Sequence, residues 1–191
     1  MTGRQAPREA GRSGDPDIAD VRAAQADPAA FGALYRRYLD RVYGYCFYLL
    51  GDHHDAEDAT ERTFLAALGA IPRFRDEGAS FRSWLFRIAH NQVANALRTR
   101  SRRRTARLDL VPEPVGAPDP ADGLSSADDA RRVRRALASL AGDRRQVVVL
   151  RFVDGLSARE IGAVLGRSEG AVRVLQHRAL RELAALLGPD D

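Results

Sequence analysis

Residues 156–183 read LSAREIGAVLGRSEGAVRVLQHRALREL, a stretch that carries the boundary signals of two successive helices. Ser157 and Glu160 form a capping box, in which each side chain satisfies a free amide at the start of a helix. Gly166 ends that short helix, and Ser168 caps a longer one. This spacing is typical of a helix-turn-helix, whose second helix enters the major groove of DNA. Taken alone, the motif also fits an ordinary pair of packed helices with a solvated basic face.

The outward face of the second helix offers side chains suited to base edges and phosphates. All 30 basic residues of the chain are Arg, and the net charge is +4. The Arg fork can bridge two acceptors of guanine, Gln can pair with adenine, and a hydroxyl at the helix start can reach a phosphate. The candidate contacts with duplex DNA are Arg167, Ser168, Glu169, Arg173, Gln176, His177 and Arg178.

The rest of the chain also has a helical pattern. Apolar residues recur at three- and four-residue steps, and no long segment alternates with a period of two. A first helix follows Asp27 and ends at Gly51, a second lies between Asp52 and Pro72, and a third starts after Ser80. Two more helices precede the capping box. The sequence therefore predicts an all-α fold.

Composition divides the chain into two small helical domains. Residues 105–124 contain four prolines and several acids, which predicts a semi-extended, flexible linker. Residues 1–26 have little apolar periodicity and are interpreted as a mobile leader. The predicted domains are residues 27–104 and 125–191. On the sequence alone, they can either pack together or tumble separately on the linker.

The second and third helices carry opposite charges. Acids at the start of the second helix complement the helix dipole, but this does not account for Glu61 beside the bulky Phe64 and Leu65, so the face is interpreted as a docking surface for a basic partner. The third helix interleaves Arg with aromatic and amide side chains and has no acid from Phe81 to Arg104. Such a surface suits single-stranded DNA, on which bases stack and phosphates pair with cations. The alternative is a place in the core for the apolar side chains of this helix, namely Phe81, Trp84, Leu85 and Ile88.

These stretches together resemble one family, the extracytoplasmic-function (group IV) sigma factors of the sigma-70 family. The resemblance rests on DAEDATERTFLAAL (55–68), FRSWLFRIAHNQVANALRTR (81–100) and LRFVDGLSAREIGAVLGRSEGAVRVLQHRALREL (150–183). It implies a subunit that binds bacterial core RNA polymerase and directs it to promoters, commonly restrained by an anti-sigma factor. The chain departs from the family in having Asn95 where Asp is frequent and Arg173-Val174-Leu175 where Lys-Ser-Arg is frequent.

The resemblance also assigns roles to the domains. The first domain would be region 2, which holds the β′ clamp helices and captures the melted -10 strand. The second would be region 4, which seats on the β flap and reads the -35 element with the helix-turn-helix. The implied polymerase contacts are Asp55, Asp58, Glu61, Phe64 and Leu65, and the implied -10 contacts are Arg75, Ser80, Phe81, Trp84, Arg87, His90, Asn91, Asn95 and Arg98.

Other classes of protein fit the sequence less well. A conventional helix-turn-helix regulator of the response-regulator type needs a receiver with strands, and the first half of the chain has no strand signal. A metal phosphohydrolase would need further ligands beside His53, His54 and Asp55, so we expect no enzyme activity, no cofactor and no metal site. Cys46 is the single cysteine, which rules out a disulfide scaffold. Without an apolar run long enough for a membrane span or a signal peptide, the expected location is the cytoplasm.

Overall fold

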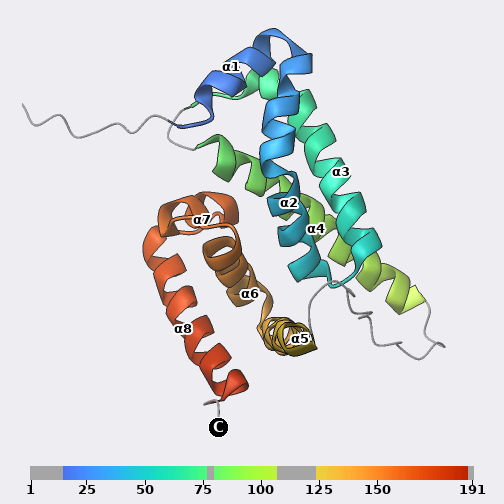
Figure 1. Cartoon of the computed structure of the whole chain (residues 1–191), viewed down its shortest axis with the longest axis vertical. Helices are drawn as coiled ribbons and strands as arrows, with labels where there is room; N and C mark the ends of the chain where they lie inside the picture. The colour runs from blue at the N-terminus through green and yellow to red at the C-terminus, as the bar shows by residue number, and fades with distance from the viewer. Residues whose placement is uncertain (1–14, 77–79, 107–123, 189–191) are drawn as a thin grey trace, which may run out of the picture.

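The computed structural model describes residues 15–76, 80–106 and 124–188, and every regular element within these ranges is helical (Figure 1). The prediction of an all-α fold is confirmed. Most of the predicted linker, residues 107–123, lies outside the described residues. The elements are α1 (Ile18–Ala26), η1 (Pro28–Ala30), α2 (Phe31–Leu50), α3 (His53–Ala70), η2 (Ile71–Arg73), α4 (Phe81–Ala106), α5 (Leu124–Ser139), α6 (Gly142–Val148), η3 (Val149–Val153), α7 (Ala158–Leu165) and α8 (Glu169–Leu187).

Helix boundaries follow local side-chain chemistry. Gly51 ends α2 in the left-handed conformation at φ 71°, which glycine adopts without steric cost. The Asp52 side chain then caps α3 by accepting a hydrogen bond from the Asp55 amide at 2.9 Å. Ser157 and Glu160 form the predicted capping box at the start of α7, and Ser168 caps α8. Each of these boundaries was predicted from the sequence.

The N-terminal segment differs from the predicted mobile leader. Residues 18–26 form α1, whose Val21 and Ala24 are buried against the first domain. Asp17 is also buried, and its carboxylate accepts hydrogen bonds from Arg37, at 2.5 Å, and from the Tyr38 hydroxyl. This segment is ordered because a buried carboxylate with two donors on α2 holds it, a tertiary contact that the local pattern does not encode.

Aromatic side chains fill the core of the first domain between α2, α3 and α4. Phe81 is fully buried and packs edge-on against Tyr38 and Phe74, with ring centroids 5.8 and 6.0 Å apart. Tyr45 and Phe86 form a third edge-on pair, with ring centroids 5.6 Å apart. The Tyr38–Phe81 and Tyr45–Phe86 pairs cross from α2 to α4, so the long basic helix is fixed on the domain by large apolar contacts.

In the second domain, α7 and α8 form the helix-turn-helix, and α5 and α6 pack against α8. Helix α6 continues into η3, a π-helical turn that leads to Gly155 and then α7. Helices α7 and α8 meet closely at Gly162, where a Cβ atom would lie 2.6 Å from the Arg167 carbonyl oxygen. Only glycine fits at this position without displacing the backbone. The absence of a side chain therefore allows the turn between α7 and α8 to lie close to α7.

The two domains pack against each other. One apolar cluster includes Phe81 and Leu85 of α4 together with Leu156 and Ile161 of the second domain. Figure 1 shows the start of α4 lying directly beside α7, with α8 on the outer side. Of the two arrangements that the sequence allowed, the structure adopts the packed one.

Candidate protein and nucleic-acid interfaces

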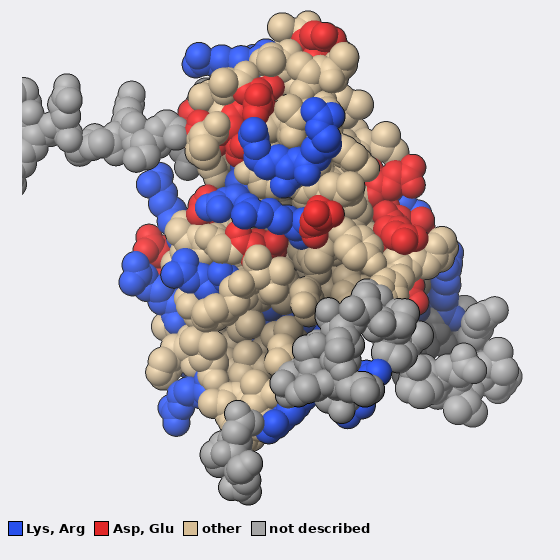
Figure 2. Space-filling view, in the orientation of Figure 1, with Lys and Arg blue, Asp and Glu red and all other residues tan. Residues whose placement is uncertain are grey.

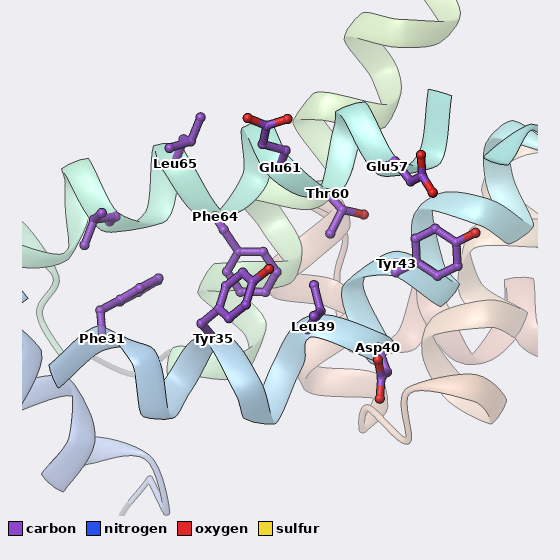
Figure 3. A pocket seen from close by; sticks show the side chains of 11 residues that line it. Phe31, Tyr35, Leu39, Asp40, Tyr43, Glu57, Thr60, Glu61, Phe64 and Leu65 are labelled. Atoms are coloured by element: carbon purple, nitrogen blue, oxygen red, sulfur yellow. The ribbon is translucent and has the colours of Figure 1, made fainter. Parts of the chain in front are cut away.

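A groove of about 640 Å³ lies between α2 and α3 (Figure 3). Phe64 lies at its base, with the Tyr35 ring 4.8 Å away in an edge-on contact. Leu65 stands on its rim and is 61% exposed. The charged lining residues are all acidic, so the groove combines an exposed apolar surface with negative charge. Its lining consists of Phe31, Tyr35, Leu39, Asp40, Tyr43, Glu57, Thr60, Glu61, Phe64, Leu65 and Leu68.

The residues predicted to contact the polymerase all lie on α3, but only three of them line the groove. Glu61, Phe64 and Leu65 line the groove. Asp55 and Asp58 are not among the lining residues, and Asp58 pairs with Arg62 at 3.2 Å. Three of the five residues predicted to contact the polymerase therefore line this groove.

Sequence reasoning missed the contribution of α2 to this surface. Tyr35, Leu39 and Tyr43 recur at four-residue steps, and this repeat lies beside the buried face of α2. The repeat was a usable signal, because residues four apart share a helix face. It could not show that α3 lies alongside to complete the groove.

The predicted single-strand contacts include one continuous stripe on α4. Trp84, Arg87, Asn91, Asn95 and Arg98 follow one another at steps of three or four residues, and all but the half-buried Trp84 are exposed. The Trp84 ring rests on Phe74 and Phe81, with centroids 5.2 and 5.5 Å away. The stripe thus offers an aromatic edge, two amides and two guanidinium groups in a row.

The other predicted -10 residues lie elsewhere, and the structure differs from the prediction for Phe81 and His90. Phe81 is fully buried in the core. His90 is half-buried on another face of α4, where its ring lies 3.4 Å from the Tyr45 hydroxyl and burial lowers its pKa. Ser80 donates to Glu160 at 3.1 Å, and Arg75 donates to the Phe74 carbonyl at 3.0 Å.

The helix-turn-helix presents most of its predicted DNA contacts to solvent. Arg173, His177 and Arg178 are exposed on α8, whereas Gln176 is half-buried. Two of the arginines already hold carboxylates, because Arg173 pairs with Glu169 at 2.6 Å and Arg167 with Asp143 at 2.7 Å. Ser168 accepts from the Ala171 amide at 3.2 Å, which leaves its hydroxyl proton available to a phosphate.

One carboxylate joins the two domains. Glu160 accepts three hydrogen bonds from Arg82 of α4, at 2.7, 2.8 and 3.2 Å, while it also caps α7 through Ser157. Burial alone would raise the pKa of Glu160, but the hydrogen bonds from Arg82 and Ser157 outweigh it and hold the pKa below its usual value. Arg82 was not among the predicted site residues, because 78 positions separate it from Glu160.

A second carboxylate lies buried at the same junction. Asp154 is 2% exposed, and neither of its carboxylate oxygens has a hydrogen-bond partner within the described part of the chain. Burial raises the pKa of Asp154 to about 7, although the charges of Arg41 and Arg82 act in the opposite direction. The ionised form is thus disfavoured in the packed arrangement.

Within residues 15–76, 80–106 and 124–188, no group of three or more His, Cys, Asp or Glu side chains could hold a metal ion. Among the same residues, no helix is both long and apolar enough to span a bilayer.

Comparison with known proteins places each domain in a defined family. The family model described as Sigma-70 region 2 matches residues 34–103, and that described as Sigma-70, region 4 matches residues 130–183. The ECF RNA polymerase sigma factor BldN of Streptomyces coelicolor is 39% identical over 173 residues, which cover 90% of this chain and 65% of BldN. The chain thus spans just under two thirds of that relative. The ECF RNA polymerase sigma factor ShbA of Streptomyces griseus is 36% identical, with 86% of this chain and 91% of ShbA covered.

Solved structures share the fold. CnrH, solved in complex with the cytosolic domain of CnrY, matches with a TM-score of 0.69 and 31% identity, covering 93% of this chain and 100% of CnrH. The sigma factor RpoE of Bartonella quintana, solved with the anti-sigma factor NepR, has a TM-score of 0.71 at 24% identity, covering 84% of this chain and 98% of RpoE.

The buried Asp154 carboxyl predicts a pH dependence of stability. Because its pKa is raised on folding, the native state keeps the proton as pH rises above 3.8, whereas the unfolded chain loses it. We therefore expect the free energy of unfolding of the wild type to fall, relative to that of Asp154→Asn, between about pH 4 and pH 7 and then to level off. Above pH 7, the wild type should have lost about 2–4 kcal/mol of unfolding free energy relative to Asp154→Asn, as measured by urea unfolding.

Asp143→Asn is the control for this comparison, because it makes the same chemical change at a carboxylate that is 53% exposed. We expect no comparable gain in stability for this variant above pH 7. Parallel pH profiles for the wild type and Asp154→Asn would contradict the raised pKa.

Proposed function

Since the chain belongs to the extracytoplasmic-function sigma factors of the sigma-70 family, we propose that it binds bacterial core RNA polymerase and directs it to promoters. The observation that carries this proposal is the pairing of region 2 and region 4 matches in one chain. A conventional helix-turn-helix regulator would account for the second match alone. The proposed region 2 extends over residues 27–104, with α1 packed on it, and the proposed region 4 over residues 125–191. The activity would take place in the cytoplasm, where the polymerase meets DNA.

The α2–α3 groove is the proposed polymerase docking site. An exposed apolar rim at Leu65 gains free energy when a partner covers it, and the acids Asp40, Glu57 and Glu61 favour a partner with positive charge. A basic, amphipathic helical segment such as the β′ clamp would satisfy both requirements. Glu61, Phe64 and Leu65 would make direct contact, while Asp55 and Asp58 would act at the edge of the interface.

The α4 stripe is the proposed site for the melted -10 strand. Opening a base pair costs a few kcal/mol of stacking and pairing free energy. Exposed amides and arginines beside the Trp84 edge can repay that cost by binding the unpaired bases and their phosphates. Strand capture of this kind requires no nucleotide hydrolysis by the chain.

Region 4 is the proposed reader of the -35 element, with the exposed N-terminal half of α8 in the major groove. Arg167 and Arg173 would exchange their present carboxylate partners for DNA. We also propose that a protein partner, an anti-sigma factor, restrains the chain. The support is that CnrH, which has the same fold and is 31% identical, was solved in complex with a second protein, the cytosolic domain of CnrY.

Run-off transcription with core RNA polymerase and a pool of promoter fragments tests the proposed function. We expect discrete new transcripts only when the chain is present. In Leu65→Ser, the loss of apolar burial should raise the chain concentration for half-maximal transcription about tenfold, while transcription at saturation is kept.

The matched control is Leu186→Ser, which removes an apolar side chain of similar exposure, 48%, at the far end of α8. It should transcribe like the wild type. Absence of transcripts with the wild-type chain would contradict the sigma-factor function, and a wild-type response from Leu65→Ser would contradict the docking site.

Asn91 tests the strand-capture role of α4. Its side chain is exposed, so Asn91→Ala should fold normally but lower promoter opening about threefold to tenfold, because a contact with unpaired DNA is lost. Permanganate reactivity of unpaired thymines measures opening, and gel shift measures initial binding to the closed duplex. Thr99→Ala, an exposed position beside the stripe, is the control. Equal loss of opening and initial binding in Asn91→Ala would refute strand capture.

A further inference from the structure

The recognition face of α8 contains an apolar side chain that the fold does not use. Val174 is 51% exposed, in the second turn of the helix. Valine is also a weaker helix former than most residues, because its branched side chain loses rotamer freedom. Neither packing nor helix propensity therefore explains valine at this position.

Val174 lies beside an open stretch of backbone and beside exposed basic side chains. Gly170, one turn earlier, has no atom within 4 Å of the place where a Cβ would stand. Arg173, His177 and Arg178 next to Val174 are exposed, and Arg181 follows two turns along. Figure 2 shows basic side chains projecting from the edge of the molecule where α7 and α8 lie. A surface of this charge fits a polyanion, and a helix of this width fits the major groove of duplex DNA.

The major groove offers one apolar group to such a side chain. Thymine is the only base that presents a methyl group there, and contact with an apolar side chain is the means by which proteins select it. Gly170 has no side chain and faces open space, which would let the start of α8 approach the groove closely and bring Val174 near the base edges.

We propose that Val174 determines part of the promoter specificity by packing on the C5 methyl group of a thymine in the -35 element. This inference rests on the proposed function of region 4. The arginines around Val174 supply affinity through phosphates and guanine, whereas Val174 supplies a preference that depends on one methyl group. The chain would accordingly prefer thymine at the contacted base pair. A chain with a polar residue at position 174 would not have this preference.

Deoxyuridine provides the test, because it differs from thymidine only in lacking the C5 methyl. Duplexes bound by the holoenzyme, the full chain with core polymerase, are selected from a random library, and each thymine of the selected -35 motif is replaced singly by deoxyuridine. We expect one replacement to weaken wild-type binding about threefold to fivefold. In Val174→Ser the same replacement should have no effect.

Val133→Ser is the matched control, since Val133 is also a helical valine on the surface, 44% exposed, but lies on α5. It should keep the wild-type loss on deoxyuridine replacement. If no thymine is sensitive in the wild type, or if Val174→Ser shows the same sensitivity, the inference is overturned while sequence-specific binding still supports the proposed function. If no duplex is selected at all, both the proposed function and the inference are overturned.

Discussion

The carboxylate of Glu160 stabilises the start of α7 in the second domain and also binds Arg82 in the first domain. It closes the capping box that starts α7, and it accepts three hydrogen bonds from Arg82 at the start of α4. Arg82 and Glu160 are only 27% and 19% exposed, so this pair is shielded from water and salt more than a surface ion pair would be. A single side chain thereby fixes the first helix of the helix-turn-helix and the orientation of that motif relative to the long basic helix.

This contact between Arg82 and Glu160, the joint between the two domains, has a consequence for the proposed binding of promoter DNA. Ser80 and Arg82, at the start of α4, are engaged by α7, whereas the stripe from Trp84 to Arg98 and the outer face of α8 stay exposed. Separation of the domains would break the joint and expose apolar side chains of the shared cluster, among them Leu156 and Ile161. Exposing them costs free energy unless a partner covers them. Polymerase, which would hold both proposed domains at once, is suited to compensate that cost.

Local signals predicted the helices and the motif well, because a cap or a terminating glycine acts within a few residues. The capping box of Ser157 and Glu160 and the end of α2 at Gly51 are such cases. Tertiary contacts were beyond the sequence: α1 is held by the buried Asp17, and Glu160 meets Arg82 from 78 positions away. Spacing also could not tell which aromatic residue of α4 faces inward. Phe81 is buried and Trp84 lies at the edge, although both fit a helical repeat.

The joint between the domains can be measured through Trp84, the only tryptophan, which lies in the first domain whereas Glu160 lies in the second. Urea unfolding followed by Trp84 fluorescence is compared for Arg82→Gln, Glu160→Gln and the double variant, since Gln at position 160 keeps the capping box. The packed structure predicts that either change destabilises the Trp84 domain and that the double variant loses little more, a coupling of about 1–3 kcal/mol. If the two changes in the free energy of unfolding add up in the double variant, the packed arrangement of the domains is contradicted. It is also contradicted if Glu160→Gln leaves the urea midpoint of the Trp84 transition unchanged.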